Sequence, residues 1–163
     1  APLVERLLKP VARLFGMLST AVILLLLALT TYSVFMRYVI GRPPVWIDEL
    51  TGFLLVAAIM FGVTEAYRRY DHISIDLLTS QLGARGTSLA RLFSDLCVLG
   101  FAVVLGVSSW EAIEFARMFG SYTPGAIEIE SWIPQLPMLI GALALGSFAI
   151  ARFIGHLTAE LRK

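Results

Sequence analysis

The sequence has 163 residues, of which 58% are hydrophobic and 15% are charged, whereas about a quarter of the residues in a soluble domain are charged. The formal net charge is +1, and the sequence contains neither an acidic tail nor a basic face suited to nucleic acid. This composition excludes an ordinary water-soluble or nucleic-acid-binding domain and is typical of an integral membrane protein. We expect one membrane domain over residues 1–163.

The first apolar run, Leu14–Met36, has 23 uncharged residues, more than the roughly 20 that one helical crossing requires. Three basic residues precede it, as in a secretory signal: Arg6, Lys9 and Arg13. The core of such a signal has only about 7–15 apolar residues, however, and no convincing small-x-small cleavage motif follows this run. The run therefore predicts a retained transmembrane helix over about residues 13–38.

The second and third apolar runs are shorter than one crossing of the bilayer. Residues 50–64 and residues 96–110 each contain 15 uncharged residues, which as a helix are about 22 Å long against a hydrocarbon core of about 30 Å. We still predict helices over about residues 45–67 and 88–116. Because carboxylates flank both runs, these groups must lie near the interfaces, be paired, or be shielded by other protein.

Basic residues at helical spacing offer partners for two of these flanking carboxylates. Glu65 is followed by Arg68 and Arg69, and Asp95 is preceded by Arg91 four residues earlier. Such spacings place both members of a pair on one face of a helix. We interpret Glu65, Arg68 and Arg69 as anchors at the cytoplasmic interface.

The middle connection is predicted to contain a short amphipathic helix over about residues 72–82, lying in the inner membrane interface. His72 and Asp76 would be further anchors at this interface. The alternation of residues 72–77 would also suit a strand, but an isolated strand at a membrane surface has no partner for its backbone.

The fourth run, Ser131–Ala151, has 21 uncharged residues and predicts a helix over about residues 131–154. Pro134 and Pro137 would lie in its opening turns, where a missing amide donor is tolerated. Its small residues could support close contacts between helices; they include Gly141, Ala142, Ala144, Gly146 and Ala149.

The distribution of basic residues predicts the orientation. Ten of the 13 Lys and Arg residues lie in the N-terminal segment, the middle connection and the C-terminal segment, and the other two connections hold only Arg37, Arg42 and Arg117. Cytoplasmic flanks carry the excess of Lys and Arg. We therefore expect an all-α integral membrane protein with four transmembrane helices, the interfacial helix, and both termini in the cytoplasm.

Residues that could carry chemistry are few. No nucleophile–base pair, metal-binding spacing or phosphate-binding glycine loop can be found, and the lone Cys97 cannot form a disulfide framework. The only histidines, His72 and His156, fall at predicted membrane edges, where packing at the interface is the expected role. We expect no enzyme activity, metal or cofactor. A small proton-coupled multidrug exporter that acts alone as an oligomer is the alternative, but it needs an ionisable group inside the membrane, and the first run has none.

A series of motifs connects the ends of the first two spans with the middle connection. They are Phe35–Tyr38, Pro44–Glu49, Phe61–Arg68 and His72–Asp76, with weaker echoes in Tyr122–Pro124 and Trp132–Pro134. Together they resemble the small membrane subunit, of the DctQ type, of tripartite ATP-independent periplasmic (TRAP) transporters. The Trp, the acidic pair and the His-Ile-x-x-Asp pattern in series are fairly specific, although Asp48 stands where the family often has Glu.

The resemblance implies a secondary transporter for organic acids in a bacterial or archaeal inner membrane. A large membrane subunit would carry the substrate and sodium sites, so sodium is expected in that partner. A soluble periplasmic binding protein would deliver the substrate. The small subunit would buttress the large one among membrane lipids and help to dock the binding protein. We hypothesise that the large subunit covers one side of the short second and third helices.

By analogy with the family, the outer residues are candidates for docking or subunit contacts, or else anchor the helix ends. These candidates are Arg37, Arg42, Trp46, Asp48, Glu49, Glu128 and Glu130.

Overall fold

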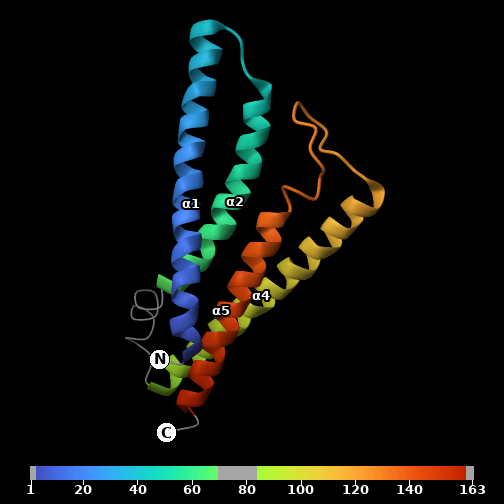
Figure 1. Cartoon of the computed structure of the whole chain (residues 1–163). Coiled ribbons are helices and arrows are strands. Elements are labelled where there is room, and N and C mark those ends of the chain that lie inside the picture. Colours follow the sequence, from blue (N-terminus) through green and yellow to red (C-terminus); the bar gives the residue numbers. More distant parts are fainter. Residues whose placement is uncertain (1–2, 70–83, 161–163) are drawn as a thin grey trace.

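The computed structural model describes residues 3–69 and 84–160 (Figure 1). These residues form long helices: α1 (Leu3–Phe35), which continues as the π-helix η1 (Met36–Ile40), α2 (Val45–Arg69), α4 (Ala84–Phe119) and α5 (Leu136–Glu160). Four segments are long and apolar enough to cross a membrane: Lys9–Ile40, Val45–Arg69, Leu89–Phe119 and Leu136–Thr158. The predicted all-α membrane fold with four spans is confirmed. The interfacial helix predicted over about residues 72–82, with His72 and Asp76, lies outside the described residues.

The helices run alternately up and down, so the molecule has two distinct ends (Figure 1). The start of α1 and the end of α5 lie together at one end, which we call the terminal end. The opposite end, which we call the loop end, is made by the connections over residues 41–44 and 120–135.

The helices extend further than the apolar runs predict, except at the start of α5. Hydropathy identifies only the part of a helix that is compatible with lipid. The helices expected from about residues 13 and 88 therefore begin earlier, at Leu3 and Ala84. The fourth helix, expected from about residue 131, begins at Leu136 instead. Residues 131–135 form turns, and Pro134 lies among them, where it disfavours a helical conformation of the residue before it. Pro137 lies in the first turn of α5.

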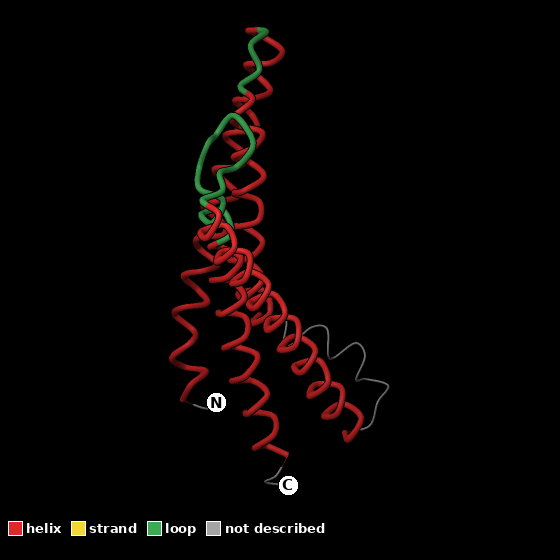
Figure 2. Tube along the Cα trace, turned by 90° about the vertical axis from the view of Figure 1, so that its right-hand side faces the viewer, coloured by secondary structure: helices red, strands yellow, loops and turns green. Residues whose placement is uncertain are grey.

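The four spans form an open arrangement instead of a closed ring. α1 packs on α2, α2 on α5, and α5 on α4, with a smaller contact between α1 and α5. Within the described segments the backbone of α4 approaches only α5 among the other helices, and Figure 1 shows α4 leaning away from α1 and α2 toward the loop end. In the view turned by 90°, the helices separate from one another toward the terminal end (Figure 2). α1 and α4 are therefore the outer helices.

The buried share of each helix agrees with this arrangement of inner and outer helices. In the most apolar windows of α2 and α5, 28% and 39% of the residues are buried, against 6% and 17% in α1 and α4. The less exposed positions of α1 recur every three or four residues, as in a coiled coil: Ala12, Phe15, Ser19, Val22, Leu26, Leu29, Ser33 and Met36. This narrow stripe gives α1 one main neighbour, and the rest of its surface suits lipid.

Small residues allow α2 to approach both α1 and α5 closely. The Ser19 hydroxyl of α1 donates a 2.8 Å hydrogen bond to the Ala58 carbonyl of α2. Gly141 of α5 lies so close to α2 that a Cβ atom there would be 2.9 Å from the Met60 carbonyl oxygen. These contacts are typical of membrane helices, whose packing relies on small side chains and interhelical hydrogen bonds.

Candidate partner-contact site at the loop end

At the terminal end, the last turns of α2 contain the expected charge cluster. Arg68 donates two hydrogen bonds to Glu65, of 2.7 and 2.8 Å, and Arg69 donates one of 2.6 Å. The Glu65 side chain is buried against Gly16 of α1, where an added Cβ would lie 2.8 Å from its Cγ. The ion pairs predicted from the spacing are therefore present, and their position at the cytoplasmic interface stays a prediction.

The predicted pairing of Asp95 with Arg91 is wrong. Asp95 of α4 is fully buried, and one of its oxygens accepts a 2.6 Å hydrogen bond from the Tyr67 hydroxyl of α2. The other oxygen lies 2.7 Å from Nδ1 of His156, and Arg152 forms a 3.4 Å ion pair with the carboxylate. Groups from two neighbouring helices thus satisfy Asp95 in place of a residue on its own helix. His156, expected only to pack at the interface, is part of this polar cluster.

These contacts explain how the short apolar runs are accommodated. With Glu65 paired, the stretch of α2 that suits the membrane extends over residues 50–67, about 27 Å of helix. With Asp95 enclosed, the corresponding stretch of α4 extends over residues 92–110, about 28 Å. Both lengths approach the roughly 30 Å hydrocarbon core. These two carboxylates are therefore covered by the chain's own helices, and our hypothesis of shielding by a large subunit is not required for them.

At the loop end, Glu49 holds the connection between α4 and α5 onto the start of α2. Its carboxylate accepts a 3.0 Å hydrogen bond from the Ile127 amide, and Gly125 packs directly against the carboxylate oxygens. A side chain at position 125 would collide with Glu49. Within the loop, the Thr123 amide donates a 2.9 Å hydrogen bond to the Ile129 carbonyl. Glu49 thus has a contact inside the chain.

Other candidate residues face outward beside this connection. Arg37 of η1 and Asp48 of α2 form a 3.1 Å ion pair, with about half of each side chain or more exposed. The pair spans the turn at Gly41, whose φ of +73° is a left-handed conformation that glycine adopts readily. Arg42 and Trp46 are also exposed.

The two remaining candidate residues, Glu128 and Glu130, are both exposed. Glu130 also accepts a hydrogen bond from the Trp132 indole nitrogen. The guanidinium of Arg117, in the last turn of α4, lies 5.9 Å from the centre of the Trp132 ring. Arg117 was not among the predicted contact residues, since its only signal in the sequence is a basic residue near a helix end. It lines a pocket of about 210 Å³ with Tyr122, Glu130 and Trp132.

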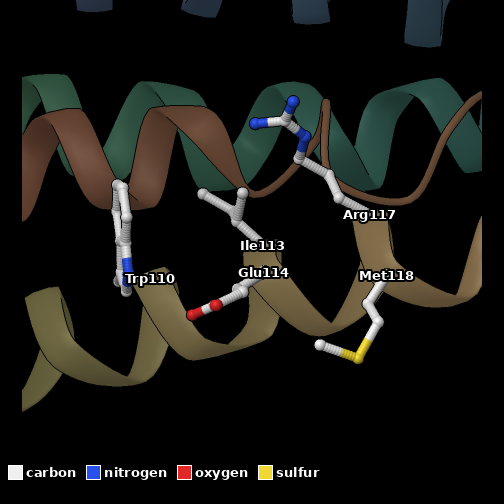
Figure 3. A pocket seen from close by; sticks show the side chains of 5 residues that line it. All are labelled: Trp110, Ile113, Glu114, Arg117 and Met118. Atoms are coloured by element: carbon white, nitrogen blue, oxygen red, sulfur yellow. The ribbon is translucent and has the colours of Figure 1, made fainter.

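A second pocket lies beside the first, along the part of α4 nearest the loop end. It has a volume of about 480 Å³ and is lined by Trp110, Ile113, Glu114, Arg117 and Met118 (Figure 3). Both pockets combine Trp with Arg117, and these two residue types are enriched in protein interfaces. Among the described residues, no three His, Cys, Asp or Glu side chains gather closely enough to suggest a metal site.

Four long apolar helices, joined by interhelical polar contacts, define this chain as a multi-pass membrane protein. It belongs to the DctQ component family of the tripartite ATP-independent periplasmic transporters, whose family model matches residues 26–159. It is therefore a permease subunit of the TRAP transporter type.

Two curated relatives are similar to parts of the chain. The C4-dicarboxylate TRAP transporter small permease protein DctQ of Vibrio cholerae is 32% identical over 82 residues, which are 50% of this chain and 35% of that protein. The isethionate TRAP transporter permease protein DctMQ of Oleidesulfovibrio alaskensis is 24% identical over 105 residues, or 62% of this chain and 16% of that protein. The matched regions thus span about a third and a sixth of these relatives.

Proposed function

We propose that this chain is the small, non-catalytic membrane subunit of a sodium-coupled TRAP transporter for organic acids. It resides in the inner membrane of a bacterium or archaeon, with both termini in the cytoplasm. The match to the DctQ family over residues 26–159 carries this proposal. The organic anions in the names of the two relatives, a C4-dicarboxylate and isethionate, support the substrate class. The substrate and sodium sites reside in the large subunit.

Its first role is to buttress the large membrane subunit. The open arrangement supports this role, because it leaves the outer helices of the described segments free for a neighbour. Purification of the chain with and without the large subunit tests it. We expect lower thermal stability for the chain alone, and equal stability would contradict an obligate buttress.

Its second role is to help a periplasmic binding protein to dock at the loop end. The exposed Arg37–Asp48 pair, with Arg42 and Trp46 beside it, supports this role because its charges are available to an approaching protein. Asp48→Lys should therefore reduce uptake by the complete transporter while membrane insertion stays normal. Asp48→Asn is the control that removes charge without reversing it. Unchanged uptake by Asp48→Lys would remove this pair from the docking surface.

A further inference from the structure

The outward face of α4 near the loop end exposes a mixed apolar and acidic surface. We call it the α4 edge and define it by Trp110, Glu111, Glu114, Phe115 and Met118, which lie on one side of the helix at helical spacing. Trp110, Phe115 and Met118 are 60%, 62% and 73% exposed. Both carboxylates are exposed as well.

The opposite face of the same turns belongs to the interior of the protein. Ser109, Ile113 and Ala116 are buried on that side, where α4 packs on α5. The α4 edge therefore points away from the rest of the described chain, and its surroundings must be supplied by lipid, water or another protein.

The carboxylates of the α4 edge have no ion pair or hydrogen bond with a side chain in residues 3–69 and 84–160. Arg117 follows Glu114 by three residues, a spacing that suits an ion pair on a helix. In Figure 3, however, the Arg117 side chain points away from Glu114, and its guanidinium lies over Trp132. Neither Glu111 nor Glu114 is thus ion-paired within the described chain.

The other outer helix differs in chemistry. α1 carries no charged residue from Leu14 to Met36, and the hydroxyls of Thr20 and Thr31 donate to carbonyls of the same helix, at 3.0 and 2.8 Å. Lipid alone can therefore cover this part of α1. On the α4 edge, lipid suits the apolar side chains but not the carboxylates, and water suits only the carboxylates. A protein surface that has both apolar area and a basic group satisfies both.

We propose that the α4 edge is the surface on which the large membrane subunit packs, and that this partner places a Lys or Arg side chain against Glu111 and Glu114. The pocket of about 480 Å³, which Glu114 lines with Trp110, Met118 and Arg117, offers room for such a side chain on its Glu114 side. Because α4 is an outer helix, the partner can reach this face from the side of the helix row. The inference rests on the proposed function, which supplies the large subunit as the neighbour.

Crosslinking in the complete transporter, in native membranes, tests the position of the interface. A photoreactive p-benzoylphenylalanine at Met118 should crosslink to the large subunit several-fold more than the same residue at Leu27 of α1, an apolar position of similar exposure, 64%, on the other outer helix. Equal or stronger crosslinking from Leu27, or no crosslink from Met118 to the large subunit, would overturn the proposal.

Charge reversal tests the chemistry of the partner. The double variant Glu111→Lys/Glu114→Lys should lower recovery of the large subunit with the tagged chain by about tenfold or more, since like charges now face each other. Glu111→Gln/Glu114→Gln, which removes the charges without reversing them, should lower it less. Full recovery with the double Lys variant would contradict the proposal.

The same experiments separate this inference from the proposed function. If the wild-type chain fails to recover the large subunit at all, both fail. If the wild type recovers it, but Met118 does not crosslink to it and the double Lys variant recovers it normally, the α4 edge alone is refuted. The crosslinking arm leaves both carboxylates in place, so it does not depend on how well the Lys variant folds.

Discussion

The Asp95 carboxylate links α4 with α2 and α5. It accepts a hydrogen bond from Tyr67 of α2 and is paired with Arg152 and His156 of α5. Removal of one member of a buried ion pair typically costs about 3–5 kcal/mol, and here the half-buried Tyr67, Arg152 and His156 would lose their shared charged acceptor. We therefore expect Asp95→Ala to lower the free energy of unfolding by an amount of this order. Thermal unfolding of the purified chain in a mild detergent measures the effect.

The matched control is Asp48→Ala, which removes an exposed carboxylate from the pair with Arg37. Exposed pairs contribute only about 0–1 kcal/mol. Equal losses for Asp95→Ala and Asp48→Ala would contradict the structural role that we assign to the buried cluster.

Glu49 is expected to hold the loop through its hydrogen bond from the Ile127 amide. Glu49→Gln keeps the size of the side chain but replaces a charged acceptor with a neutral one, which weakens the hydrogen bond. Hydrogen exchange at Ile127 should become faster in this variant. Glu128→Gln, which changes an exposed loop carboxylate, should leave the exchange unchanged. If Glu49→Gln gives the wild-type rate, Glu49 does not hold the loop.

At the residue scale, local pairs could be predicted and distant ones could not. Glu65 and its arginines are three and four residues apart, so the helical repeat alone brings them together. Asp95 lies 28 residues from Tyr67 and 61 residues from His156 in the sequence. Only the packing of α5 against both α2 and α4 decides that these groups meet, and the nearer Arg91 was therefore a misleading partner.

The contact between α2 and α5 depends on the absence of a side chain at Gly141. A Cβ atom there would lie 2.8–2.9 Å from the Met60 side chain and carbonyl oxygen, so a larger residue must separate the two helices. We expect Gly141→Val to destabilise the protein by about 1–3 kcal/mol, the usual cost of overpacking. The same thermal unfolding assay measures the loss.

Gly100 of α4 provides the control, since nothing lies within 4 Å of a Cβ atom added there. Gly100→Val should leave stability nearly unchanged. A loss in Gly100→Val as large as in Gly141→Val would show that β-branching in a membrane helix, and not the α2–α5 contact, causes the effect.

The existence of four spans followed from hydropathy, because about 20 apolar residues in a helix have few alternatives to crossing the bilayer. The residues at which the helices begin and end were less predictable. α1 and α4 continue past their apolar runs, since charged residues are good helix formers outside lipid. The late start of α5 at Leu136 agrees with the conformational effect of Pro134, which a count of uncharged residues ignores.

For the whole molecule, the sequence motifs indicated the family, but the order in which the helices pack could not be read from composition. An apolar face suits a neighbouring helix as well as it suits lipid. The structure resolves this ambiguity: α2 and α5 are the inner helices, and α1 and α4 are the outer ones. The difference in charge between the outward faces of α1 and α4 becomes meaningful only with this arrangement known.

Transport in reconstituted vesicles tests the central claim most directly. The claim is that this chain supports a transporter without providing the route for the solute. We predict no uptake of labelled C4-dicarboxylate or other organic acid by vesicles that contain this chain alone, with or without a sodium or proton gradient. Uptake should appear when the large subunit and the binding protein are added. Gradient-driven uptake by the chain alone would contradict the account.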